Sequence, residues 1–369
     1  MKNRLILLDY GSAGNAGFYI NAWLKALDGR QVTGVVHRKC KVVGVDYKRL
    51  NYFGNINIEL LWLPEVIVKI SRMIDLYFGL ILTMLKVHFL ARRESVTIIV
   101  NIYQSFKVYE YFLRCLPRTV CKNLVIHDAV ELAHNYPKFL MTDRNRLLHL
   151  ADALIVHNQY SMIKLVEVMC PIYVVPFPLP AQSSVIANKE LSCPIKLLFI
   201  GSGRLEKGIE NLCLSYNLLP ESAKNRIDLS IIGKNVLKFL PGTELSRDIN
   251  VEDRFVDDHE FENIIAKAHF VIFPYTGGSN SGVFANAISM NVPCITSQIS
   301  MFSESQFYNI NLSFSTDLEL ASLLEEISHM KDSEYKEIII KLGLQREDYC
   351  KNFVKNIQVL YKELCHQET

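Results

Sequence analysis

The stretch Lys196-Leu-Leu-Phe-Ile-Gly-Ser-Gly-Arg-Leu-Glu-Lys-Gly208 joins a short apolar run to a glycine-rich turn, and a helical pattern follows up to Leu219. An apolar run of this length bounded by glycine is typical of a parallel strand buried on both faces. The same order of strand, turn and helix then repeats, with predicted strands at 227–232, 270–273 and 294–296 and predicted helices at 261–268 and 283–290. The alternation predicts an α/β domain with a parallel sheet.

The same rhythm occupies the N-terminal half, with apolar runs at 4–8, 32–36, 96–100, 124–126 and 153–156. Between the two halves, the proline- and serine-rich segment after Val175 has no period of either kind and indicates a linker. We therefore predict two α/β domains, and the final charged stretch is helical in period. The predicted boundaries are 1–180 for the N-terminal domain, 181–194 for the linker, 195–345 for the C-terminal domain and 346–369 for a C-terminal helix able to return to the N-terminal domain.

Composition limits the class of protein. Half of the 369 residues are hydrophobic and 21% are charged, which excludes a disordered or collagen-like chain. The nine cysteines form no C-x-x-C pair and most lie among apolar neighbours, so they indicate reduced thiols in place of a zinc site or disulfides. The apolar run before Asp9 is too short for a signal peptide. A cytoplasmic protein without a metal site is the expectation.

Charge is distributed unevenly. Residues 1–180 contain 22 Lys and Arg against 13 Asp and Glu, a net charge of +9, and the remainder carries −7. This division indicates two different partners, or variation among solvated faces. The apolar stretch 76–90, followed by Arg92 and Arg93, is interrupted by Lys86 and His88 before the ~20 residues that a membrane span requires. It predicts a buried helix or, alternatively, peripheral contact of the basic N-terminal domain with the cytoplasmic face of a membrane.

Ligands of open parallel sheets bind beyond the carboxyl ends of the strands. Arg204 and Lys207 follow the strand at 196–200 and stand at a helix entrance, where free N–H groups and the helix dipole attract anions. The small residues of 274–283 follow the strand at 270–273 and form a second candidate anion cradle. Two cradles after neighbouring strands suit a diphosphate; a solvated basic turn and a ligand-free loop are the alternatives.

The motifs Gly201-Ser-Gly-Arg204-x-x-Lys207-Gly208 and Pro274-Tyr…Ser281-Gly282-Val283…Ala287…Pro293 resemble the C-terminal domain of GT-B-fold glycosyltransferases, closest to family four. The resemblance follows the order of nearly the whole chain, including His127-Asp128 and residues 151–158. It implies two Rossmann-like domains facing each other across a cleft. It also implies a hexosyltransferase-like, metal-independent enzyme of surface polysaccharide biosynthesis, which moves a sugar from a nucleotide-diphosphate donor to a glycan or lipid-linked glycan. No cofactor besides the donor and no nucleic-acid partner is expected.

The resemblance also implies roles for individual residues. Those implied for the donor diphosphate are Arg204, Lys207, Ser281, Gly282 and Val283. Those implied for the nucleotide are Gly233, Lys234 and Asn286. The acid/base candidates are His127, Asp128 and Glu131, and the glycine-rich loop after the first strand contains Gly11, Gly14 and Gly17.

One departure from the family concerns two glutamates that usually lie eight residues apart in the second cradle. Gly278 and Asn286 stand at these positions. An amide can still hydrogen-bond a ribose hydroxyl, whereas glycine cannot replace a carboxylate. The sugar and the stereochemical outcome therefore stay open, as does a non-catalytic nucleotide-sugar-binding protein of the same fold.

A different enzyme class shares some of these features. The Gly11 loop and the pair Tyr160 and Lys164 also resemble NADP-dependent short-chain dehydrogenases. A nicotinamide ribose normally needs an acidic residue about 20 positions after the loop. Residues 37–40 offer none, although Arg38 suits a 2′-phosphate. This alternative leaves the two anion cradles unexplained.

Overall fold

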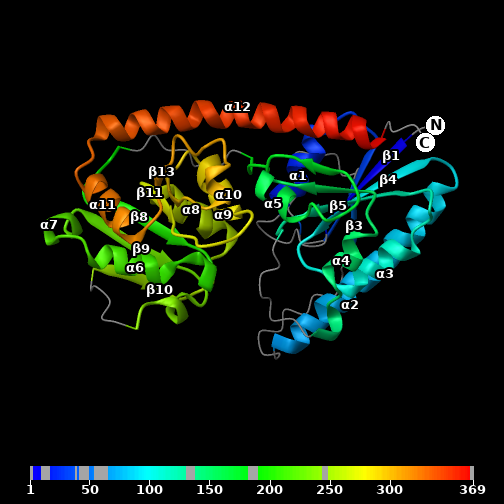
Figure 1. Ribbon diagram of the computed structural model, residues 1–369, viewed down its shortest axis with the longest axis horizontal. Coiled ribbons are helices and arrows are strands. Elements are labelled where there is room, and N and C mark those ends of the chain that lie inside the picture. Colours follow the sequence, from blue (N-terminus) through cyan, green and yellow to red (C-terminus); the bar gives the residue numbers. More distant parts are fainter. Residues whose placement is uncertain are drawn as a thin grey trace. The chain divides into compact units, whose positions relative to one another are not determined.

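The chain divides into two compact units in the computed structural model, which describes residues 3–9, 17–37, 40, 50–53, 65–129, 138–181, 190–242 and 248–365 (Figure 1). Unit 1 comprises Met1–Pro178 and Phe353–Thr369, and unit 2 comprises Leu179–Asn352.

Unit 1 is built on a seven-stranded parallel sheet with the order β3-β2-β1-β4-β5-β6-β7. Its strands are β1 (Asn3–Asp9), β2 (Val32–His37), β3 (Leu50–Phe53), β4 (Ser95–Ile102), β5 (Cys121–Ile126), β6 (Ala153–Val156) and β7 (Ile172–Val174). Its helices are α1 (Gly17–Ala26), α2 (Glu65–Ala91), α3 (Lys107–Cys115), α4 (Arg144–Leu148) and α5 (Gln159–Lys164), with a short 3-10 turn, η2 (Lys138–Leu140).

Two hydrophobic cores lie on the two faces of this sheet. Successive side chains of a strand point to opposite faces, so Ile6 and Leu8 enter one core and Leu5 and Leu7 enter the other. The first core is covered by α2 and α3, and the second by α1. Burial on both faces explains why the strands are continuous apolar runs in the sequence.

The long helix α12 (Asp332–Cys365) contributes to the cores of both units. Within unit 2 its Leu342 is buried, and within unit 1 Phe353, Ile357 and Leu360 pack into the core with α1. Spacings of three and four residues put these side chains on one helix face. Its end is also held by hydrogen bonds, since Asn3 Nδ2 donates to the Cys365 carbonyl at 2.6 Å.

Unit 2 contains a six-stranded parallel sheet with the order β10-β9-β8-β11-β12-β13. Its strands are β8 (Ile195–Ile200), β9 (Ile227–Ile232), β10 (Ile249–Glu252), β11 (Phe270–Phe273), β12 (Cys294–Ser297) and β13 (Leu312–Phe314). Its helices are α6 (Ile209–Asn217), α7 (Glu221–Lys224), α8 (Asp258–Lys267), α9 (Gly282–Ser289), α10 (Ser300–Ser303) and α11 (Asp317–Ser328), with 3-10 turns η3 (Leu205–Lys207) and η4 (Val236–Phe239).

Each sheet has the same point at which the strand order reverses. In unit 1 the chain builds outward from β1 to β3 and then restarts on the other side of β1 with β4. In unit 2 the corresponding neighbours are β8 and β11. This is the Rossmann strand order, and ligands of such sheets bind beyond the carboxyl ends of the two strands at the reversal. The loops after β8 and β11 are therefore the place to look for a site in unit 2.

Candidate functional site

The loops that follow β8 and β11 come together in unit 2. The Thr276 N–H donates to the Glu206 carbonyl at 2.9 Å. Gly208, at φ +62, lies so close to the other loop that a Cβ atom on it would be 1.8 Å from the Pro274 carbonyl oxygen. Only glycine allows this approach, because any side chain would push the loops apart. The two predicted anion cradles are thus adjacent parts of one structure.

Lys207 lies over the ring of Tyr275. Its Nζ atom is 3.5 Å from the ring centroid, which is the geometry of a cation–π contact. The Tyr275 side chain is buried, and burial raises the pKa of its hydroxyl to about 12. The ring therefore stays neutral at physiological pH and offers its face to the ammonium group. The backbone at Tyr275 is also held, because Ser297 Oγ donates to its carbonyl at 2.6 Å.

Arg204 precedes η3, and its Nε atom lies 3.0 Å from Oε1 of Glu206. The Arg204 side chain is 41% exposed, so solvent screens this ion pair and its contribution to stability is small. A more highly charged anion competes well for such a guanidinium, particularly if it accepts two parallel hydrogen bonds.

The second cradle ends at the first turn of α9. Ser281 is the N-cap, and its Oγ accepts a hydrogen bond from the Phe284 N–H at 3.3 Å. Val283 lies next to the first loop, with its Cγ2 3.9 Å from the position of a Cβ on Gly201. The first N–H groups of a helix have no acceptor within the helix, and α9 begins beside the loop after β8.

The two residues that replace the family's glutamates have clear structural settings. Gly278 has φ +125, a backbone conformation that residues with side chains rarely adopt. Asn286 is buried in α9, where its Nδ2 donates to the Gly282 carbonyl at 2.7 Å. An amide has two N–H groups and an oxygen, so this bond uses only part of its capacity.

A third loop, after β9, packs against the first. A Cβ on Gly233 would lie 1.8 Å from the Gly201 carbonyl oxygen, and the Gly203 N–H donates to the Lys234 carbonyl at 2.8 Å. The Lys234 side chain is exposed. The backbone of the following turn is anchored by the Asp253 carboxylate, which accepts from the Asn235 N–H at 2.8 Å.

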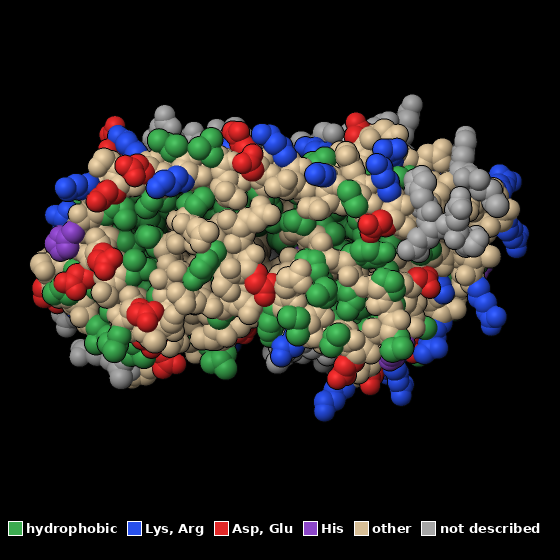
Figure 2. All heavy atoms as spheres, turned by 45° about the horizontal axis from the view of Figure 1, so that its top comes forward, with side chains coloured by type: hydrophobic (Ala, Val, Ile, Leu, Met, Phe, Trp, Pro, Cys, Tyr) green, Lys and Arg blue, Asp and Glu red, His purple; other side chains and the backbone are tan. Residues whose placement is uncertain are grey.

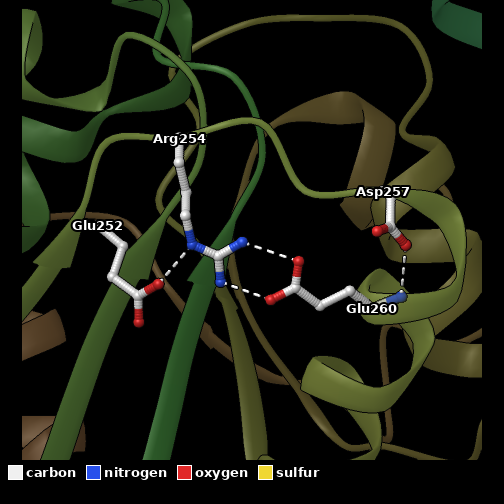
Figure 3. Close-up of polar contacts among 4 residues, drawn as sticks. All are labelled: Glu252, Arg254, Asp257 and Glu260. Atoms are coloured by element: carbon white, nitrogen blue, oxygen red, sulfur yellow. Dashed lines mark hydrogen bonds and ion pairs between the residues drawn. The ribbon is translucent and has the colours of Figure 1, made fainter.

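Arg254, which follows β10, differs from Arg204 in how it is paired. Figure 3 shows its guanidinium between two carboxylates, with Nε 2.6 Å from Glu252 and two further bonds of 2.6 and 2.8 Å to Glu260. These hydrogen bonds raise the pKa of Arg254 above its already high usual value. Asp257 accepts from the Glu260 N–H at 2.9 Å. A guanidinium that already donates to two carboxylates links the elements that carry them, and it has few donors left to bind a phosphate.

Unit 1 has a buried polar cluster at the carboxyl ends of β1, β4, β5 and β6, with one member from α1, which we call the Asp9 cluster. Its members are Asp9, Tyr19, Asn101, Tyr103, His127 and His157. The Asp9 carboxylate is fully buried and accepts from Asn101 Nδ2 at 2.8 Å and from the Tyr103 hydroxyl at 3.3 Å. The Tyr103 ring stacks on His127, with centroids 4.2 Å apart and planes 4° from parallel.

The two histidines of the Asp9 cluster are neutral. Burial lowers the pKa of His157 to about 4, and burial together with the neighbouring His157 lowers the pKa of His127 well below its usual range. His157 Nδ1 donates to the Val175 carbonyl at 3.0 Å, so its Nε2 accepts from the Tyr19 hydroxyl at 3.1 Å. A neutral imidazole offers one hydrogen-bond donor and one acceptor.

The two Rossmann-like units of the chain define the GT-B class of folds, so the predicted fold class is confirmed.

A scan against models of protein families and a search of curated proteins each found no match. The structure is similar to sucrose-phosphate synthase from Thermosynechococcus elongatus, with a TM-score of 0.65, 15% identity and coverage of 100% of both chains. It is also similar to trehalose-6-phosphate synthase OtsA, with a TM-score of 0.64, 11% identity and coverage of 99% of both chains. A third similar structure is HepE from Anabaena in complex with UDP and glucose, with a TM-score of 0.61, 12% identity and coverage of 98% of this chain and 99% of HepE.

The structure brings some of the predicted site residues together and leaves others outside its described part. Arg204, Lys207, Ser281 and Val283 lie on the adjoining loops of unit 2. Asp128 lies beside His127, and its carbonyl accepts from Arg144 at 2.6 Å. Gly17 begins α1. Gly11, Gly14 and Glu131 lie outside the described residues.

Asp9, Asn101 and Tyr103 were not predicted as site residues. Each stands at the end of an apolar strand or directly after it. This is the rule that selected His127, so applying it to every strand would have found them.

Proposed function

We propose that the chain is a glycosyltransferase of the family-four type, which transfers a sugar from a nucleotide-diphosphate donor to a glycan or lipid-linked glycan. The observation that carries the proposal is the convergence of the loops after β8 and β11, with Arg204 and Lys207 among them, at the strand reversal of unit 2. Cations and helix N–H groups at one point of a sheet suit a ligand with two phosphoryl groups.

In this proposal the two cations stabilise the leaving group. When the sugar leaves, the nucleoside diphosphate gains negative charge, and preorganised cations lower the barrier to that charge. Arg204 exchanges Glu206 for the diphosphate, and Lys207 is held in place by the Tyr275 ring. The first turn of α9 adds N–H donors, and Gly233, Lys234 and Asn286 bind the nucleoside part. In this proposal Arg204 and Lys207 supply the positive charge that a metal ion supplies in other phosphate sites. We therefore propose that EDTA does not abolish the transferase activity.

Unit 1 supplies the acceptor side in this proposal. His127, with Asp128 beside it and Glu131 as a second acid/base candidate, contacts the transferred sugar or moves a proton. The glycine-rich loop with Gly11, Gly14 and Gly17 is our candidate for binding the donor phosphate and the acceptor. We further propose a role in surface polysaccharide assembly in the cytoplasm. HepE was crystallised with UDP and glucose, which supports a nucleotide-sugar donor for a chain of this fold.

A donor screen with a matched pair of variants tests the proposal. Calorimetric titration with UDP, GDP and NADPH, followed by transfer assays with a panel of nucleotide sugars, should identify a nucleoside diphosphate as the ligand. Arg204→Ala should lower the transfer rate by about 10²-fold or more, because it removes one preorganised charge. Lys267→Ala, an exposed cation at the end of α8, is the control and should have no effect. Tight binding of NADPH without binding of a nucleoside diphosphate contradicts the proposal.

A second candidate function is a non-catalytic nucleotide-sugar-binding protein of the same fold. The observation in its favour is that neither Gly278 nor Asn286 carries a carboxylate, and that the Gly278 backbone disfavours any side chain. Such a protein binds the donor and releases no nucleoside diphosphate. Product release in the presence of crude lipid-linked acceptors therefore distinguishes it from the enzyme.

A further inference from the structure

The outward side of α2 and of the turn after it consists of large apolar and basic side chains. Between residues 74 and 93, six large apolar side chains are between 49% and 62% exposed: Ile74, Phe78, Ile81, Leu82, Leu85 and Phe89. The other exposed residues of this range are Lys86, Arg92 and Arg93. The six apolar residues recur at spacings of three and four, so they fall within an arc of about 100° on the helix. We call these nine residues the α2 outer face.

The opposite side of α2 attaches the helix to unit 1. Leu76, Leu80 and Val87 are buried in one core with Val96 and other residues of β4. The window Ile74–Ala91 has a mean hydropathy of 1.6 and is long and apolar enough to cross a membrane by length and composition, with 33% of the window buried. Both sides of the helix are apolar, which explains this hydropathy. Crossing a bilayer would detach the inner side from β4, so the structure fits contact with a surface better than a span.

The positive charge of unit 1 and of the α2 outer face favours a negatively charged partner. Unit 1 contains 24 Lys and Arg against 15 Asp and Glu, a net charge of +9, whereas unit 2 contains 16 against 23, a net charge of −7. On the face drawn in Figure 2, blue Lys and Arg side chains gather along the edge of unit 1. Arg93 stacks its guanidinium over the Phe89 ring at 4.2 Å, which puts a cation directly beside the apolar stripe.

A second copy of the chain is a poor partner for this face. Pairing two such faces would bring basic side chains against basic side chains, which repel one another. The acidic residues within α2 are Glu65 and Asp75, and the Asp75 side chain is buried. A lipid bilayer with anionic headgroups satisfies both parts of the face, because its acyl region accepts the apolar stripe and its phosphates and carboxylates accept the flanking cations.

We infer that the α2 outer face docks unit 1 onto the surface of an anionic lipid bilayer, with α2 lying in the plane of the interface. The inference rests on this face alone and is independent of the proposed transferase activity. Its failure is therefore distinguishable from failure of the donor site, which is tested by nucleotide titration.

Vesicle flotation with the full-length protein tests the inference. The vesicles contain phosphatidylcholine alone or with phosphatidylserine, at low and high salt. The double variant Phe78→Ser, Leu85→Gln interrupts the apolar stripe. Its matched control is Phe255→Ser, Leu318→Gln, which removes a phenylalanine and a leucine that are 75% and 72% exposed on unit 2. The double variant Arg92→Gln, Arg93→Gln removes two cations, and its control is Lys341→Gln, Lys351→Gln on the exposed side of α12. Circular dichroism and nucleotide titration check that each variant is folded.

The wild-type protein should float with phosphatidylserine vesicles and be released by high salt. The Phe78 and Leu85 variant should bind at least about tenfold more weakly than its control. The Arg92 and Arg93 variant should lose about ten- to thirtyfold in affinity for phosphatidylserine vesicles, with little change for phosphatidylcholine.

Three results overturn the inference. The first is absence of flotation of the wild-type protein, or equal flotation of the Phe78 and Leu85 variant and its control. The second is self-association of the wild-type protein in sedimentation velocity, without vesicle binding, if the Phe78 and Leu85 variant abolishes it. This result would assign the α2 outer face to contact with a second copy of the chain. The third is retention on vesicles after alkaline carbonate extraction, which indicates a span.

Discussion

The ammonium group of Lys207 lies 3.5 Å from the centroid of the Tyr275 ring, and the two residues belong to loops that follow different strands. The contact fixes the direction of the lysine side chain at the strand reversal of unit 2. A lysine side chain loses conformational entropy when its four torsions are ordered on binding an anion. The contact with the Tyr275 ring orders the side chain before the anion binds, so less entropy is lost on binding.

Tyr275→Leu should therefore weaken the binding of UDP or GDP, relative to the corresponding nucleoside, by about three- to thirtyfold, the range that a buried cation–π contact supplies. Tyr275→Phe keeps the aromatic face and should stay within about twofold of the wild type. Isothermal titration with the diphosphate and with the nucleoside gives the ratio. Equal losses in the phenylalanine and leucine variants would show that the ring face does not hold Lys207.

Gly208→Ala should destabilise unit 2 by more than the cost of a positive φ alone. That cost is about 1–2 kcal/mol, and at Gly208 the new Cβ also meets the Pro274 carbonyl oxygen at 1.8 Å. Gly29→Ala is the matched control, since Gly29 has φ +75 and nothing within 4 Å of its Cβ position. The measurement is urea unfolding followed by circular dichroism. A Gly208→Ala variant no less stable than Gly29→Ala would mean that the two loops separate easily.

Leu360→Ala in α12 should destabilise unit 1, because Leu360 is buried in its core and such truncations cost about 2–5 kcal/mol. Leu342→Ala is the control on the same helix, buried in unit 2. Both tryptophans, Trp23 and Trp62, fall within the residue range of unit 1, so fluorescence in urea follows that unit. We expect Leu360→Ala alone to lower the fluorescence midpoint. An equal shift from Leu342→Ala would mean that the two units unfold together.

Unit 1 should lose stability in mild acid. Burial lowers the pKa of His157 to about 4, whereas an unfolded histidine titrates near about 6.5. The unfolded chain therefore binds protons that the folded unit does not, so the stability is full above about pH 6.5 and falls as the pH drops toward 4. For His157 alone the loss is about 3 kcal/mol.

The check is the urea midpoint of tryptophan fluorescence at about pH 7.5 and about pH 4.5. His157→Gln should make the midpoint depend less on pH. His329→Gln, at an exposed histidine of unit 2, should leave the dependence unchanged. A pH dependence that survives His157→Gln in full would assign it to other groups.

The predictions from sequence were most successful where structure depends on local pattern. The run Leu197–Ile200 and the glycine turn after it predicted β8 and its loop, because these four strand residues are buried and a strand buried on both faces is apolar at successive positions. The short edge strands β10 and β13 were not predicted, since a strand at the edge of a sheet is only partly buried and loses the apolar signal. The sequence also did not predict which side of α2 is exposed, because a helix that is apolar on all sides does not indicate which side lies outward.

The sequence by itself determined the alternation of strands and helices, the GT-B class of the fold, and the loops on which a diphosphate site is proposed. Only the tertiary structure decided that Gly208 meets Pro274, that Tyr275 lies under Lys207 and that Asp9 is buried beside Asn101. The physical reason is that periodic burial is recorded in neighbouring residues, whereas a contact between loops depends on how strands far apart in the chain are paired in the sheet.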